Sequence, residues 1–137
     1  MSTGLSPFMA SAHVALGGAV GAVGRYQLGR AITHWLGPQV VTTFPWATLA
    51  INVIGSFAMG LLAGWMARHG TQYGENVRLL VGVGLLGGFT TFSAFSLEMM
   101  LLVERGQTAS ALAYAGISVL AGLTGLYLGL VVMRFAA

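Results

Sequence analysis

Charged residues divide the chain into four long, mainly apolar stretches. These uncharged stretches are residues 1–24, 31–67, 79–97 and 106–133. A helix that crosses a bilayer needs about 20 mostly apolar residues, and each stretch with its flanks is long enough for one. The pattern therefore predicts an all-α membrane protein with four transmembrane helices per subunit. We expect these helices at residues 9–29, 44–67, 77–103 and 109–133.

The composition supports a chain that lies almost wholly within the membrane. Of its 137 residues, 56% are hydrophobic and only 7% are charged, whereas about a quarter of the residues in soluble domains are charged. The connections of about ten to fifteen residues are too short for a soluble domain, which usually needs about 50. Residues 1–137 are therefore expected to form a single four-helix transmembrane domain.

Several classes of function receive no support from the sequence. Cysteine is absent, which excludes disulfides and cysteine-based metal sites, and His13, His34 and His69 show no metal-binding spacing. No phosphate-binding loop, zinc-protease motif or serine-hydrolase motif is present. The net charge is only +3, and the arginines lie at helix ends, where lipid phosphates are available. We predict no enzyme activity, no organic cofactor and no nucleic-acid partner.

The spacing of glycines in the predicted helices favours a homodimer. Four GxxxG pairs allow helix backbones to approach closely in lipid, and one small four-helix unit has little interior for them, so we expect some of these faces to meet a second subunit. The pairs are Gly17 with Gly21, Gly60 with Gly64, Gly84 with Gly88, and Gly125 with Gly129.

The arginines show no bias between the two sides of the membrane. Since Lys and Arg set the orientation of a membrane protein, equal counts predict insertion both ways and antiparallel pairing. The two groups are Arg25, Arg30 and Arg105 on one side, and Arg68, Arg78 and Arg134 on the other.

Polar residues recur every four positions in the second and fourth predicted helices. Thr48, Asn52 and Ser56 form a stripe in the second, and Tyr114 and Ser118 form a weaker one in the fourth. The Asn52 carboxamide is costly in hydrocarbon unless its donors and acceptors find partners. Two explanations stay open: hydrogen bonds between helices, or the lining of a pathway in which the amide faces an anion.

The stretch "GGFTTFSAF", residues 87–95, interrupts the third apolar run. Glycine and β-branched threonine are poor helix formers, so the sequence predicts a break at the centre of this helix. Carbonyls freed at membrane depth need donors or a cation. Phe92 and Phe95 fall on one face, where they either pack in the core or offer partly positive ring edges to an anion.

Glu98 is the only acid that can lie inside a predicted span, and an intramembrane carboxylate is a candidate functional group. It either couples transport to protons or sits near the membrane interface. Ser96, Glu98 and Thr48 are secondary site candidates.

Three segments of the chain resemble the motifs of a known protein family, and the resemblance extends over nearly the full length of the chain. "GGAVGAVGRY" at 17–26, "PWATLAINVIGSFAMG" at 45–60 and "GLLGGFTTFSAFSLE" at 84–98 are similar to motifs of the Fluc fluoride channels, also called the CrcB family. Ala47 and Ala94 depart from it, standing where the family usually has Gly and Thr.

The resemblance implies a dual-topology antiparallel homodimer in the bacterial inner membrane, through which fluoride leaves the cytoplasm passively. Gly87 and Thr90 would offer backbone carbonyls to a structural Na⁺ at the dimer centre, and Arg25 would lie near a pore entrance. The residues that match the lining of two fluoride pores are Asn52, Phe92, Phe95, Tyr114 and Ser118.

Two alternatives belong to other classes of membrane protein. A small dual-topology, proton-coupled multidrug exporter shares the size and charge balance, but such exporters carry an essential acid in the first helix, and residues 1–24 contain none. A membrane assembly factor that transports nothing would use its glycine faces for adhesion alone.

Overall fold

A computed structural model describes residues 5–69 and 74–136, and the described chain is helical almost throughout. The elements are α1 (Pro7–Leu36), α2 (Pro38–Thr43), α3 (Trp46–His69), α4 (Gly74–Val77), the π-helix η2 (Arg78–Leu86), α5 (Gly87–Phe89), α6 (Phe92–Glu104) and α7 (Thr108–Phe135). The consecutive elements α4, η2, α5 and α6 form one long helical rod, Gly74–Glu104. The other three rods are α1, α3 and α7. All four are long and apolar enough to cross a membrane. The prediction of an all-α chain with four such helices is confirmed.

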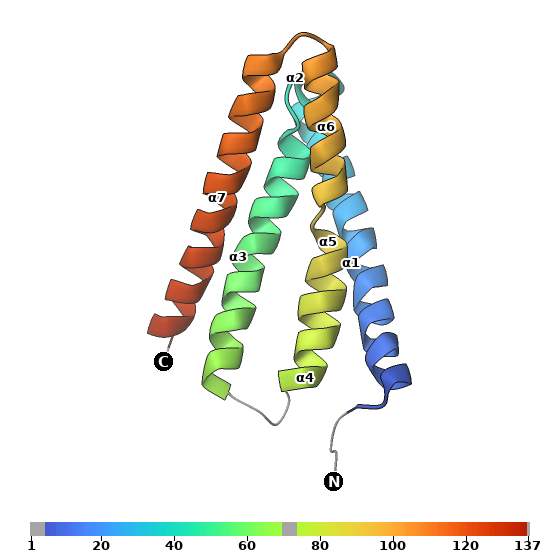
Figure 1. The fold of residues 1–137 in the computed structure, drawn as a ribbon, viewed down its shortest axis with the longest axis vertical. Helices are drawn as coiled ribbons and strands as arrows, with labels where there is room; N and C mark the ends of the chain where they lie inside the picture. Colours follow the sequence, from blue (N-terminus) through green and yellow to red (C-terminus); the bar gives the residue numbers. More distant parts are fainter. Residues whose placement is uncertain (1–4, 70–73, 137) are drawn as a thin grey trace.

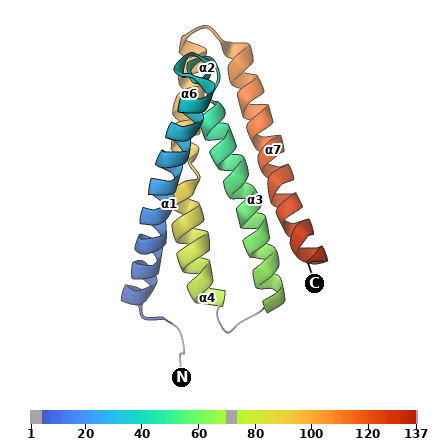
Figure 2. The same ribbon diagram turned by 180° about the vertical axis from the view of Figure 1, so that it is seen from behind.

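The four rods are arranged as two pairs that converge at one end (Figure 1). One pair is α1 with η2 and α5, and the other is α3 with α7. Both chain termini lie at the wide end, while α2 and the turn between α6 and α7 lie at the narrow end, as the reverse view also shows (Figure 2). We call these the terminal end and the α2 end.

Glycine allows the backbones of α1 and η2 to touch. A Cβ atom added to Gly17 would collide with the carbonyl of Leu80, and one added to Gly21 would collide with the carbonyl of Leu85. Gly84 and Gly88 face α1 in the same way, with Gly18 as a shared neighbour. This close approach is what GxxxG pairs permit in lipid.

The α3–α7 pair is built by the same rule. A Cβ atom on Gly60 would collide with the carbonyl of Leu126, and one on Gly129 with the carbonyl of Phe57. Gly64 and Gly125 also face the opposite helix of the pair, so all eight glycines of the four pairs are used within one subunit. The expectation that some of these faces meet a second subunit is wrong, because neighbouring helices of the same chain already fill them.

The first helix is longer than predicted and leads into a short helix where a loop was expected. Ser6 caps α1, its Oγ accepting from the amide of Met9 at 3.3 Å. The helix ends only at Gly37, whose φ of 87° suits glycine. Pro38 then begins α2, as proline does at a first helical position.

The third rod changes geometry along its length. A nine-residue π-helix, η2, precedes the short α5, and the next two residues are extended. Thr90 has φ −80° and ψ 160°, and Thr91 has φ −149° and ψ 122°. Helical geometry resumes at Phe92, where the Thr91 side chain caps α6 by accepting from the amide of Ala94 at 3.2 Å.

Candidate functional site

Asn52 holds the extended segment of the third rod. Its Nδ2 donates to the Thr91 carbonyl at 3.0 Å, and its Oδ1 accepts from the Thr91 amide at 2.8 Å. One side chain of α3 therefore satisfies both backbone groups of a residue that has left the helix. Unpaired, each group would be costly at membrane depth. Of the two explanations for Asn52, the hydrogen bond between helices is present, and one amide hydrogen remains beyond these two bonds.

Two hydrogen bonds of Thr91, one with Asn52 and one with Ala94, remove the usual helical partners of two carbonyls. In an α-helix the Gly87 carbonyl would accept from the Thr91 amide, and the Thr90 carbonyl from the Ala94 amide. The Thr91 amide instead donates to Asn52, and the Ala94 amide donates to Thr91 Oγ1. Gly87 and Thr90 are the two residues whose carbonyls the family resemblance assigns to a cation.

Glu98 forms a cluster with two hydroxyls from other helices. Thr48 Oγ1 on α3 donates to Glu98 Oε1 at 2.6 Å, and Tyr114 OH on α7 donates to Glu98 Oε2 at 2.7 Å. Tyr114 is fully buried, Thr48 is buried and Glu98 is partly buried. We call these three residues the Glu98 cluster. The carboxylate thus lies inside the subunit, where it joins α3, α6 and α7.

A row of aromatic rings runs from the extended segment towards the α2 end. Ring centroids are 5.7 Å apart for Phe92 and Phe95 and 5.0 Å for Phe95 and Tyr114. They are 5.4 Å apart for Tyr114 and Phe44, and 4.6 Å for Phe44 and Trp46. Phe92, at the inner end of the row, is 78% exposed in the single subunit. We call these five rings the aromatic row.

The two predicted serine candidates differ in their bonding. Ser118 Oγ is buried and has no hydrogen-bond partner among the described residues. Ser96 Oγ donates to the Phe92 carbonyl one turn earlier, at 2.9 Å. A buried hydroxyl without a partner is uncommon in folded proteins and calls for an explanation. Ser118 is therefore the stronger site candidate of the two.

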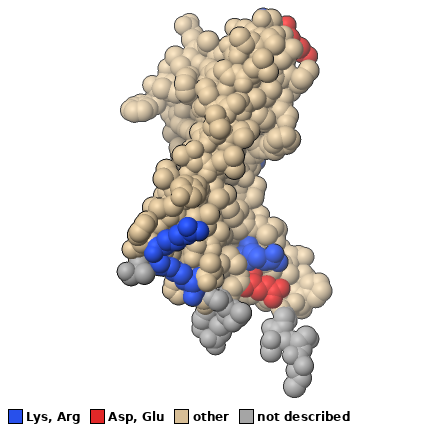
Figure 3. Space-filling model, turned by 60° about the vertical axis from the view of Figure 1, so that its left-hand side comes forward, with Lys and Arg blue, Asp and Glu red and all other residues tan. Residues whose placement is uncertain are grey.

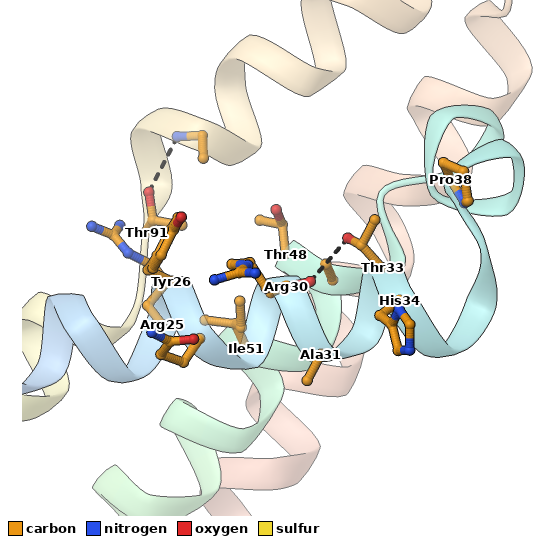
Figure 4. A pocket seen from close by; sticks show the side chains of 14 residues that line it. Arg25, Tyr26, Arg30, Ala31, Thr33, His34, Pro38, Thr48, Ile51 and Thr91 are labelled. Atoms are coloured by element: carbon orange, nitrogen blue, oxygen red, sulfur yellow. Dashed lines mark hydrogen bonds between the residues drawn. The ribbon is translucent and has the colours of Figure 1, made fainter.

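Two hollows border the extended segment. A pocket of about 280 Å³ brings together Asn52, Ser56, Thr90 and Phe92. A larger open groove of about 940 Å³ lies between α1, the start of α3 and the start of α6 (Figure 4). Its polar lining residues include Arg25, Tyr26, Arg30, Thr33, His34, Thr48 and Thr91.

Arg25 lies in this groove beside Thr91, not at a helix end (Figure 4). The equal division of arginines between the two sides is therefore wrong for Arg25, which lies at the depth of the extended segment. Two arginines remain towards the α2 end, Arg30 and Arg105, against three towards the terminal end. On the face in Figure 3, charged side chains gather mainly at the two ends.

The sequence did not identify Phe44, Arg30 or His34 as site residues. Phe44 is the first residue of the second predicted helix, and its only signal is an aromatic residue at the start of a span. Arg30 and His34 reach the groove because α1 continues beyond the predicted end.

Residues 12–130 match the family model described as CrcB-like protein, Camphor Resistance (CrcB). The chain belongs to the CrcB-like family. Three curated relatives, each named Fluoride-specific ion channel FluC, illustrate the similarity. The Novosphingobium aromaticivorans protein is 59% identical over 128 residues, which cover 93% of this chain and 98% of the relative. The Erythrobacter litoralis protein is 53% identical over 137 residues, all of both chains, and the Rhodospirillum centenum protein is 51% identical over 123 residues, 90% and 94% of the two chains.

Membership in the CrcB-like family agrees with two predictions made from the sequence. Its relatives are named as ion channels, which are not enzymes, so the prediction of no enzyme activity is confirmed. A channel family and four apolar helices indicate a multi-pass membrane protein.

Proposed function

We propose that this protein is a fluoride-selective channel of the bacterial inner membrane that lets fluoride leave the cytoplasm passively. The observation that carries the proposal is the match to the Erythrobacter litoralis fluoride channel, 53% identical over the whole of both chains. Such a channel lowers cellular fluoride without an energy source, because the ion moves down its own gradient.

The pathway follows neutral groups that can replace fluoride's water. Fluoride is small and strongly hydrated, so a pore must supply donors without holding the ion too tightly. The ring edges of Phe92 and Phe95 carry partial positive charge. Asn52 contributes its remaining amide hydrogen and Ser118 its hydroxyl, whereas Tyr114, whose only hydroxyl hydrogen goes to Glu98 Oε2, lines the path with its ring. The unpartnered, buried Oγ of Ser118 and the exposed Phe92 ring support this lining.

Arg25 attracts fluoride into the groove that leads to the lining. Its charge lies beside Thr91 at membrane depth, where an arginine that faced lipid would be costly. A water-filled groove solves this problem, because the guanidinium stays hydrated while its positive charge concentrates anions. Thr48, Glu98 and Ser96 are secondary members of the path.

The working unit is an antiparallel homodimer with two pores. One feature of the single subunit supports it: the groove that carries Arg25, whose guanidinium does not suit contact with lipid. The remaining arginines, two against three, give only a weak preference for one orientation.

A structural Na⁺ at the dimer centre is held by the carbonyls of Gly87 and Thr90, and the interruption between α5 and α6 works as a helix break that presents them. The proposal rests on the loss of their usual amide donors. Two copies supply four oxygens, which is the kind of ligand that a hard cation prefers. No described cluster of His or acidic side chains offers a competing metal site.

Fluoride efflux from proteoliposomes tests the proposed function. Vesicles loaded with fluoride should release it when the purified protein is present, and vesicles loaded with chloride should not. If dye is exported in a way that depends on Glu98 and fluoride is retained, the protein is a proton-coupled exporter. If no solute moves at all, it is an assembly factor.

A further inference from the structure

Phe44 covers the Glu98 cluster at the α2 end. Its backbone is extended between α2 and α3, with φ −147° and ψ 137°. Its ring stands edge-on to Tyr114, with the two planes at 77°. It also packs against a small buried cluster that contains Ala111, one turn before Tyr114 and only 1% exposed. Phe44 is therefore one of the side chains that cover Tyr114 and Ala111.

A single side-chain hydrogen bond ties α2 to the turn between α6 and α7. Arg105 Nη1 donates to the carbonyl of Thr42 at 3.1 Å. Thr42 lies in the last turn of α2, where helix carbonyls lack internal partners and the helix dipole is negative, so a guanidinium is a favourable donor. Since α2 has only six residues, it is too short to be stable alone, and its position depends on such contacts.

We propose that Arg105 is a positioning residue for the Glu98 cluster. By holding the Thr42 carbonyl, it keeps α2 and Phe44 seated on Tyr114 and so excludes bulk water from the cluster. The inference rests on the proposed function only for its consequence for ion flow: Phe44 then closes the α2 end of the aromatic row, and Arg105 sets how firmly it closes.

Thiol labelling measures this closure without any ion transport. Because the chain contains no cysteine, one introduced cysteine reports alone. Ala111→Cys in the purified full-length protein should react slowly with methyl methanethiosulfonate, and Thr108→Cys, at an exposed position, gives the unprotected rate. Adding Arg105→Ala should raise the labelling rate at position 111 about tenfold, which corresponds to about 1.4 kcal/mol. Arg105→Lys, which can still donate to the carbonyl, should restore most of the protection.

Arg68→Ala is the matched control. Arg68 Nη2 donates to the carbonyl of Arg134 at 2.6 Å, so this variant removes the same charge and the same kind of bond, but at the terminal end. It should leave labelling at position 111 unchanged. Equal labelling rates in the Arg105→Ala and Arg68→Ala proteins would overturn the inference.

A second variant separates closure from general loosening of the fold. Phe44→Ala should also speed labelling, and adding Arg105→Ala to it should bring no further rise, because both act through the same element. Independent, multiplying effects would contradict the proposal. A change of fluoride efflux in Arg105→Ala without faster labelling would also contradict it and leave the proposed function standing. Faster labelling in a protein that passes no fluoride would support the closure and reject the channel.

Discussion

Towards the terminal end the rods of each pair touch through glycine, whereas towards the α2 end the rods are joined by hydrogen-bonded side chains. The glycine contacts join backbone to backbone, as at Gly60 with Leu126, and leave no polar side chain to satisfy. The other half contains Asn52 bound to the Thr91 backbone and the Glu98 cluster. The glycine half is therefore complete within one subunit.

The half towards the α2 end, in contrast, contains polar groups that lack hydrogen-bond partners among the described residues of the single subunit. Ser118 Oγ is buried without a described partner, and the carbonyls of Gly87 and Thr90 have lost their usual donors. Groups of this kind are expensive in a membrane. The difference teaches that one half of the bundle supplies stability, and that the other half keeps bonding capacity for an ion, water or a second subunit.

The largest effect is expected from a substitution that disrupts the glycine contacts between α3 and α7. Gly60→Ala places a methyl group against the Leu126 carbonyl, and since backbone cannot move aside as a side chain can, the cost should reach about 3 kcal/mol. Loss of monodisperse protein, or a much lower melting temperature in detergent, would show it. Gly116→Ala is the control because its Cβ has no neighbour within 4 Å, and it should leave the melting temperature unchanged or slightly raised. Equal behaviour of the two variants would mean that the α3–α7 contact is not tight.

The next largest effect is expected when the hydrogen bonds between Asn52 and the extended segment are removed. Asn52→Ala leaves the amide and the carbonyl of Thr91 without their partners, and the two unsatisfied groups together cost at least about 2 kcal/mol. We expect a lower melting temperature and loss of fluoride efflux in proteoliposomes. Ser11→Ala is the control, because its hydroxyl bonds only within its own helix, at the terminal end. If Asn52→Ala melts normally but loses efflux, Asn52 serves the ion and not the backbone.

Sodium removal tests the carbonyls of Gly87 and Thr90. A ligand present at 100 times its dissociation constant stabilises a protein by about 2.7 kcal/mol, so exhaustive dialysis into a potassium buffer should lower the melting temperature or weaken the dimer. Returning Na⁺ should reverse the change. If melting, assembly and efflux are all independent of Na⁺, even after the protein is unfolded and refolded without it, then no Na⁺ is held there.

The smallest effect on stability is expected at Phe92, and it distinguishes this residue from the neighbouring Phe95. Phe92 is 78% exposed in the subunit, while Phe95 packs against Tyr114 at 5.0 Å. Phe92→Ile should therefore lower fluoride efflux about tenfold or more, with a change in stability within about 0.5 kcal/mol, as for other exposed positions. Phe95→Ile should lower both efflux and the melting temperature. Loss of the dimer on a sizing column in both variants would show that the rings serve packing.

Much of the architecture was predictable because the bilayer limits the choices. The positions of nine charged residues defined the four spans, since a charge in hydrocarbon is costly. Poor helix formers led to the prediction of a break in the third helix, and Thr90 and Thr91 have extended backbone angles. The glycine pairs correctly indicated close contacts but not their partners, because spacing along one helix does not say which helix faces it.

The candidate site was less predictable from spacing. Thr48 and Asn52 are one turn apart on α3, yet Thr48 bonds to Glu98 and Asn52 to Thr91. Arg25 looked like the end of a span and lies beside the extended segment, since α1 continues to Leu36. Local pattern says where a helix is amphipathic, but a helix end depends on its capping residues and on the chain that follows.

The sequence by itself determined that this is a four-helix membrane protein, where polar groups interrupt the spans, and which family its motifs resemble. Those properties follow from hydropathy, helix propensity and motif, which are local. The tertiary structure decided that the glycines are used inside one subunit, that Asn52 binds the Thr91 backbone and that Glu98 is held by hydroxyls from two other helices. These are contacts between residues far apart in the sequence, such as Gly129 with Phe57 and Thr48 with Glu98, and they depend on how the rods are rotated and paired.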